Sequence, residues 1–103
     1  MDMYTPLESD WKLFRQRLPQ WQENHMKKLC DEYAAILTGE QRGSEAFWEI
    51  EKRIRRDKER VGVIADMRRS LMYGHLWSLL EEGVITPDDL TGFSEEWKAL
   101  LLE

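Results

Sequence analysis

The residues that could coordinate a transition metal are few in this chain: His25, Cys30 and His75. His25 and Cys30 are five positions apart, whereas two ligands on one helical face are spaced by three or four. His25 also falls within a periodic series of apolar residues, which favours a packed histidine over a ligand. His75 is open to either role. The sequence therefore predicts no metal site, and we expect no cofactor.

Motifs of nucleophilic and phosphate chemistry are absent. There is no G-x-S-x-G, no glycine-rich phosphate loop and no H-E-x-x-H. Carboxylates are numerous, but on surface helices most of them only solvate the fold. A carboxylate enzyme, or one that uses Cys30, remains an alternative that would require a deep polar pocket. We expect a protein that is not an enzyme.

The stretch EEGVITPDDL, residues 81–90, resembles the second half of a calcium-binding loop with Gly83 in the sixth position. Counting back places Leu80 in the third position, where an oxygen ligand is required. A glycine that ends one helix, followed by a Thr-Pro pair that begins the next, explains the same letters. This stretch therefore predicts a connection between helices.

A basic run occupies residues 47–63, where six of the seventeen residues of FWEIEKRIRRDKERVGV are Lys or Arg. On a helix, Arg53, Arg56 and Arg60 form one row at three- and four-residue spacing. With Arg68 and Arg69 they make a candidate basic face for docking an acidic protein. The alternative is a nucleic-acid-binding helix over residues 52–69. It would use the following side chains: Arg53, Arg55, Arg56, Lys58, Arg60, Arg68 and Arg69.

Acidic residues interleave with this run. Glu49 precedes Arg53 by four positions and Glu51 precedes Arg55 by four, a spacing that supports a solvated helix. We therefore expect the basic face to point first to water and second to a protein partner.

The charge is segmented along the chain. There are 15 basic and 20 acidic residues, a net charge of −5. Residues 1–51 carry −4, residues 52–69 carry +5 and residues 70–103 carry −6. A negative average weighs against nucleic acid as the main partner. The acidic segment could instead complement a Lys- and Arg-rich channel of another protein. Its candidate carboxylates are Glu81, Glu82, Asp88, Asp89, Glu95 and Glu96.

Five tryptophans are many for 103 residues. Trp11 and Trp21 fall on an apolar series and are predicted core residues. Trp48 follows Phe47, so both rings cannot point into one interior, and Trp77 has the same relation to its neighbour Leu76. We therefore predict Trp48 and Trp77 as aromatic anchors for a protein partner or for a homodimer. The alternative is that these rings cover the ends of a small core.

These side chains must be positioned by helices, because apolar residues recur near every 3.6 positions and no stretch alternates long enough for a strand. The first region, residues 6–37, is either one helix kinked at Pro19 or two helices that meet there. A second helix is expected over residues 45–60, and a third over 63–82. A short helix follows Thr86 and a terminal helix follows Ser94.

Each expected helix has a predicted buried side. Residues 45–60 should bury Phe47, Ile50, Ile54 and Val61. Residues 63–82 should bury Ile64, Met67, Leu71, Leu76, Leu79 and Leu80, and the terminal helix should bury Trp97, Leu100 and Leu101. The predicted N-terminal caps are Thr5, Ser44, Thr86 and Ser94, and the predicted stops are Gly39, Gly83 and Gly92.

The fold class that follows is all-α. We expect one domain over residues 1–103, a small antiparallel bundle with a long N-terminal helix and two short C-terminal helices. The N-terminal acids argue against a signal peptide, and no apolar run approaches the ~20 residues of a membrane span. A single cysteine excludes an intramolecular disulfide and fits a reducing compartment. We therefore expect a cytoplasmic protein with no membrane partner.

Four segments together resemble a known family: ESDWKLFRQRLPQWQENHM, FWEIEKRIRRDKERVGV, ADMRRSLM and GVITPDDLTGFSEEW. It is an uncharacterised family of short acidic helical proteins of Gram-positive gut bacteria, often encoded on mobile elements. The label "multidrug transporter" that such proteins sometimes carry is contradicted by the absence of a membrane-spanning run. The resemblance implies no catalytic or binding residues.

The sequence thus predicts a non-enzymatic protein-interaction module. Its most specific form is a small acidic regulator or inhibitor of a bacterial nucleic-acid-handling complex, of the anti-CRISPR or antitoxin kind. Nucleic-acid binding through residues 52–69 is the alternative, and a homodimer is compatible with either.

Overall fold

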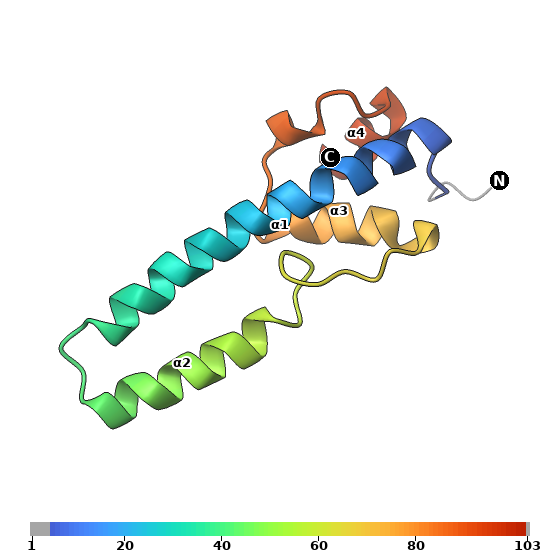
Figure 1. Ribbon diagram of the computed structural model, residues 1–103. Helices are drawn as coiled ribbons and strands as arrows, with labels where there is room; N and C mark the ends of the chain where they lie inside the picture. The colour runs from blue at the N-terminus through green and yellow to red at the C-terminus, as the bar shows by residue number, and fades with distance from the viewer. Residues whose placement is uncertain (1–4, 103) are drawn as a thin grey trace.

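The computed structural model describes residues 5–102. It contains four α-helices, α1 (Glu8–Leu37), α2 (Gly43–Asp57), α3 (Met72–Glu81) and α4 (Glu95–Leu102). Two 3₁₀ helices, η1 (Arg69–Leu71) and η2 (Pro87–Leu90), precede α3 and α4. No strand occurs among the described residues. The expected all-α class with a long N-terminal helix is confirmed (Figure 1).

The first helix runs without a break through Pro19, so of the two alternatives the single helix is confirmed and two helices meeting at Pro19 are excluded. Pro19 lies on an exposed side, where its ring and its missing N–H disturb only one turn. The predicted cap at Thr5 is also wrong. The backbone is still extended at Leu7, with φ −65° and ψ 151°, and α1 begins only at Glu8. Asp2, one of the acids that argued against a signal peptide, lies outside the described residues.

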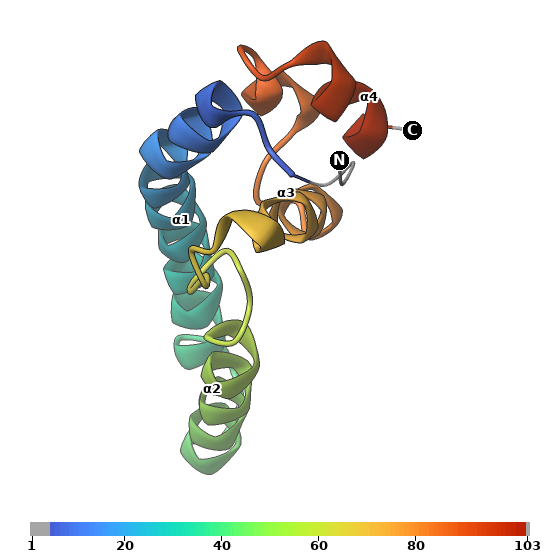
Figure 2. The same ribbon diagram turned by 90° about the vertical axis from the view of Figure 1, so that its right-hand side faces the viewer.

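The core lies at one end of the molecule. The N-terminal half of α1 packs there against α3, η2 and α4, as Figure 2 shows. Its largest fully buried apolar side chains come from α1, α3 and η2: Phe14, Met72, Leu76, Leu79 and Leu90. The predicted core residues Trp11, Trp21, Trp97 and Leu101 are buried there as well. Leu100 is only half-buried.

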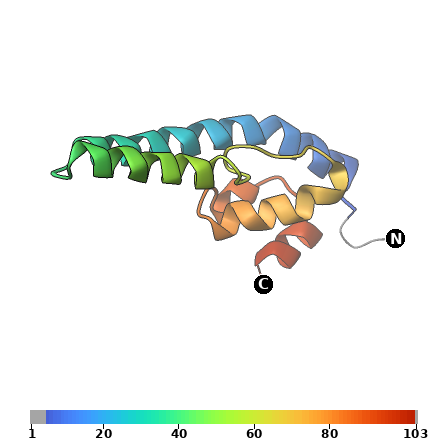
Figure 3. The same cartoon turned by 90° about the horizontal axis from the view of Figure 1, so that it is seen from below.

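The other end of the molecule is a two-helix hairpin. After Leu37 a short loop turns the chain, and α2 returns along the C-terminal half of α1 (Figures 1 and 3). The molecule is therefore elongated, with extents of 55 × 24 × 23 Å. In α2 only Ala46 and Asp57 are buried, because its main packing partner is α1.

The predicted buried side of α2 is therefore wrong in part. Phe47 is 62% exposed and Ile54 is 44% exposed, while Ile50 and Val61 are half-buried. The helix also ends at Asp57 and not at residue 60. The side of α2 that faces α1 contains Ala46, Arg53 and Asp57. Ala46 and Arg53 each come one position before a residue of the predicted apolar side, Phe47 and Ile54.

The helix expected over residues 63–82 forms only over its second half. Residues 64–68 are not helical, and Ile64 and Met67 are exposed. The reason is a turn in which Arg60 C=O accepts the Val63 and Ile64 N–H groups, at 2.9 Å each. Gly62 is buried in this turn, and a Cβ there would lie 2.5 Å from His25 Cδ2. The chain then crosses to α3 as a non-helical connection.

In the C-terminal part of the chain, the predicted helix cap at Thr86 and the predicted helix stops at Gly83 and Gly92 agree with the structure. Thr86 and Asp89 form a capping box around the start of η2, where the Thr86 N–H donates to Asp89 Oδ2 at 2.8 Å. Gly83 and Gly92 adopt φ +74° and +95°, the left-handed region that favours glycine. Gly39 is not among the positive-φ glycines of the described chain.

The start of α4 is held by a buried carboxylate from the other end of the sequence. Asp10 is 1% exposed, and it accepts hydrogen bonds from Ser94 N and Ser94 Oγ at 2.9 and 2.7 Å. It ties the N-terminal turns of α1 to α4. At the second helix the predicted cap Ser44 already lies inside α2, which begins at Gly43.

None of the helices described here is both long enough and apolar enough to cross a membrane.

Candidate protein-interaction surfaces

The basic row of α2 is neutralised by the chain's own carboxylates. Arg53 Nη2 lies 2.9 Å from Glu32 Oε1, and its Nε lies 3.6 Å from Asp57 Oδ2. Its guanidinium also stacks over the Tyr33 ring, 5.4 Å from the centroid. Arg56 contacts Asp57 at 3.1 Å. Arg53 thus holds α2 against α1.

The remaining predicted arginines are paired as well. Arg60 reaches Glu82 after α3 at 2.8 Å. Arg68 pairs with Asp66 at 2.8 Å. Arg69 pairs with Glu8 at 2.7 Å and lies over the Trp11 ring.

The five arginines do not form one continuous face. Arg53, Arg56 and Arg60 border a common groove of about 270 Å³ between the hairpin and Glu82. Arg69 instead packs at the first turn of α1, where it pairs with Glu8. The basic face expected from the sequence is therefore split into a group in the hairpin and a group beside the core.

Asp57 is the buried centre of the hairpin base. It accepts a hydrogen bond from Tyr33 Oη at 2.5 Å and one from Arg56 Nε at 3.1 Å. Burial is the largest single influence on the pKa of this carboxyl, and by itself it would raise that pKa. The hydrogen bonds from Tyr33 and Arg56, and the charges of Arg56 and Arg53, together outweigh burial, so the pKa lies below its ordinary value. Burial, followed by the hydrogen bond to Asp57, raises the pKa of Tyr33 to about 12.

Asp57 did not stand out in the sequence among the acids that interleave with the basic run. Its one available signal was the spacing Arg53–Asp57, which placed both residues on one face of the helix. The partner Tyr33 is 24 positions away and came from a separate apolar series.

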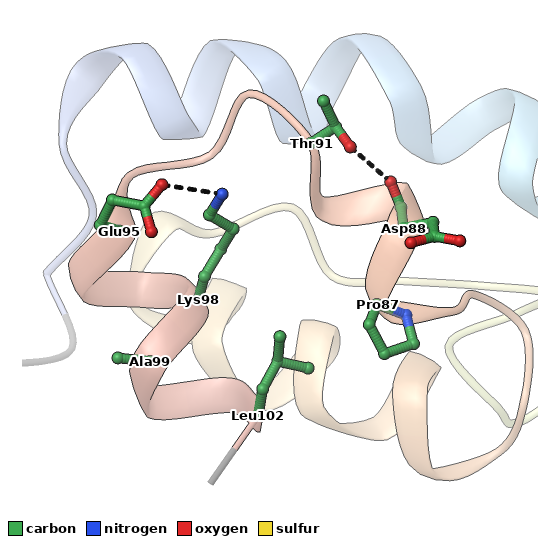
Figure 4. A pocket seen from close by; sticks show the side chains of 7 residues that line it. All are labelled: Pro87, Asp88, Thr91, Glu95, Lys98, Ala99 and Leu102. Atoms are coloured by element: carbon green, nitrogen blue, oxygen red, sulfur yellow. Dashed lines mark hydrogen bonds and ion pairs between the residues drawn. The ribbon is translucent and has the colours of Figure 1, made fainter.

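The predicted acidic residues divide into structural and open carboxylates. Asp89 belongs to the capping box and Glu82 to the ion pair with Arg60. Asp88 and Glu95 border an open depression of about 590 Å³ between η2 and α4 (Figure 4). Lys98 lies in it and pairs with Glu95 at 2.9 Å. Glu81 and Glu96 are exposed outside this depression.

The two predicted aromatic anchors are both exposed but lie on different elements. Trp48, near the start of α2, is 64% exposed and makes an edge contact with Phe47, with centroids 5.0 Å apart. Trp77 lies on α3, far along the chain from the hairpin, and is also exposed. Of the two, only Trp48 contacts another exposed apolar side chain of its own element, Phe47.

Phe47, but not Trp48, belongs to a set of exposed apolar side chains along one side of the hairpin. Met26, Cys30 and Leu37 of α1 each follow by one position a residue that faces inward, and so do Phe47 and Ile54 of α2. In two antiparallel helices, the residues that come one position after the inward-facing residues lie on the same side of the helix pair. All five side chains are exposed. We call this set the hairpin apolar face.

The metal-capable residues have other roles. His25 packs against Gly62, and His75 Nε2 lies 2.8 Å from the Asp66 carbonyl oxygen. Cys30 is exposed on the hairpin. Within residues 5–102 no three His, Cys, Asp or Glu side chains gather as a metal site would require.

Comparisons with protein-family models, with curated proteins and with solved structures gave no match to this chain.

Proposed function

We propose that this chain is a non-enzymatic protein-interaction module. The observation that carries the proposal is the hairpin apolar face. Phe47, Ile54 and Leu37 are large, exposed and aligned, and no other described element covers them. A small core elsewhere does not need these residues, whereas clustered exposed apolar side chains are typical of interaction sites.

The more specific proposal is a small acidic regulator or inhibitor of a bacterial nucleic-acid-handling complex. It is supported by the open carboxylates at the C-terminal end, Asp88 and Glu95 across the depression and Glu81 and Glu96 beyond it. A segment of net charge −6 could complement a channel lined by Lys and Arg.

Nucleic-acid binding through residues 52–69 has less support, because phosphates would compete with carboxylates that already hold Arg53, Arg56 and Arg60.

The test is affinity purification of tagged protein from its native host, read by mass spectrometry. The baits are the wild type, the double variant Asp88→Lys/Glu95→Lys and the matched charge control Asp31→Lys/Glu40→Lys, at two exposed acids away from the depression. We expect a nucleic-acid-handling complex with the wild type and the control, and its loss with the double variant. Capture that is unchanged in the double variant would refute the acidic mechanism. Capture of nothing specific by any bait would refute the interaction module itself.

A further inference from the structure

We propose that the occupant of the hairpin apolar face is a second copy of this chain, packed antiparallel so that the two hairpins form a four-helix bundle. This inference rests on the proposed function, since it takes the hairpin to be a protein-docking surface. Four observations carry it: the shape of the face, its charge, the placement of two charged residues within it, and its length.

The hairpin has one apolar side and one polar side. Met26, Leu37, Phe47 and Ile54 lie on the first. The polar side consists of the residues that come one position before the inward-facing ones. Among them are Glu32 and Arg56, which take part in the ion pairs of the hairpin base. Only one side is therefore suited to bury against a protein.

The face continues beyond the hairpin toward the core. Ile64 and Met67, in the connection to α3, border a groove of about 300 Å³ with Pro19. Pro19 lies seven positions before Met26, so it belongs to the same stripe of α1. Phe47 and Ile64, 62% and 63% exposed, thus lie at opposite ends of the face.

The charge of the hairpin permits contact between two identical copies. Residues 23–60 contain nine acids and nine bases, so their net charge is zero. The whole charge of −5 resides in the rest of the chain. Two copies that meet through the hairpins place neutral surfaces together and keep their acidic ends apart.

Two charged residues within the face are self-complementary. Glu51 and Lys58 each follow an inward-facing residue by one position, so they share the stripe of Phe47 and Ile54 on α2. They lie on either side of Ile54, three positions before it and four after it. A two-fold axis near Ile54 therefore brings Glu51 of each copy to Lys58 of the other.

Glu51 already pairs with Arg55 in one chain. Lys58 has no carboxylate partner among the residues that the structure describes. The antiparallel arrangement supplies one.

The same axis pairs the two ends of the face, because Phe47 of one copy then meets the Ile64 end of the other. The 15 residues of α2 span about 22 Å, and a face two helices wide adds about 20 Å. These dimensions multiply to roughly 440 Å², which Ile64 and Met67 extend, so the contact is smaller than the roughly 800 Å² per partner of a standard interface. A contact of this size fits a dimer that forms and dissociates with concentration.

Sedimentation equilibrium of the full chain tests this inference. We expect the wild type to pass with rising concentration from 12.4 kDa to twice that mass. Phe47→Glu and Ile64→Glu should each raise the dissociation constant by at least about tenfold. Leu7→Glu, at an apolar residue that is 48% exposed beside the core, is the control and should dimerise as the wild type does. Circular dichroism establishes that each variant keeps its helix content.

A charge exchange tests the antiparallel register. Glu51→Lys and Lys58→Glu should each weaken the dimer, and the double variant should restore it. A wild type that remains at 12.4 kDa at every concentration would overturn the inference, as would a Phe47→Glu dimer of unchanged affinity. A double variant as weak as the single ones would overturn the antiparallel arrangement. A monomeric wild type that still captures its host complex would leave the proposed function standing.

Discussion

Arg53, Arg56 and Arg60 show how a row of like charges can be structural. Each has a carboxylate of the same chain within 3.1 Å, and two of those carboxylates come from other helices or from the turn after α3. Asp57 contributes most, since it is only 5% exposed and faces both Tyr33 and Arg56. At the scale of residues, the basic run holds the hairpin to the core.

Replacement of Asp57 by Asn should destabilise the fold at neutral pH. The loss should be about 1.5–3 kcal/mol, the range for hydrogen bonds to a charged group. Because the pKa of Asp57 is lowered on folding, its contribution is complete above the unfolded pKa of about 3.9 and is lost as the pH falls through the folded pKa. Urea denaturation at neutral and acid pH measures both. An equal loss at both pH values would contradict the assignment.

Tyr33 should ionise later than an ordinary tyrosine. The structure raises its pKa to about 12, so the neutral phenol contributes stability below the unfolded pKa of about 10, and this is lost as the pH rises through about 12. Ultraviolet absorbance titration of the phenols should show one late step in the wild type. In Asp57→Asn this step should move only part of the way toward about 10, because burial, the larger cause, remains while the negative charge and hydrogen-bond acceptor of Asp57 are lost. A late step that does not move at all would show that Asp57 does not contribute to it.

At the scale of elements, the sequence could predict which segments are helices better than what covers them. The apolar period of α1 and the Thr86–Asp89 capping box are local patterns, and both form. The stripe Phe47–Ile54 was recognised as apolar, but periodicity alone does not reveal whether another element lies against it. Nothing in the described chain does.

Contacts between residues far apart in the chain also could not be predicted from the sequence. Asp10 meets Ser94 across 84 positions, and no local pattern indicates that a first-turn acid of α1 will be buried. The first part of the helix expected over residues 63–82 did not form, for a related reason. Its apolar spacing suits a helix, but Gly62 packs against His25, and the turn it makes directs the chain away.

Gly62, in the turn after α2, and Gly74, within α3, should respond oppositely to alanine. At Gly62 a Cβ would lie 2.5 Å from His25 Cδ2 and 3.0 Å from Val84 Cγ2, so Gly62→Ala should cost about 1–3 kcal/mol. At Gly74, inside α3, a Cβ would meet nothing within 4 Å. Gly74→Ala should therefore stabilise by about 0.5–1 kcal/mol through helix propensity. Thermal unfolding of the pair measures both signs, and a stabilising Gly62→Ala would refute the close packing of the turn.

At the scale of the whole molecule, the chain divides its work between two ends. The core end buries most of the large apolar side chains and carries the open carboxylates. The hairpin end buries few side chains, is electrically neutral and exposes an apolar face. Such a division is expected when one end maintains the fold and the other binds a protein.

The most direct test of that claim is hydrogen exchange of the wild type, followed by mass spectrometry at low and high protein concentration. In the isolated chain α2 depends on a single packed helix, so its amides should exchange faster than those of α3. With rising concentration, amides of α2 and of the C-terminal half of α1 should gain protection in the wild type but not in Phe47→Glu. Protection that is the same at all concentrations, or that rises equally in Phe47→Glu, would contradict the hairpin apolar face as a docking surface for a second copy.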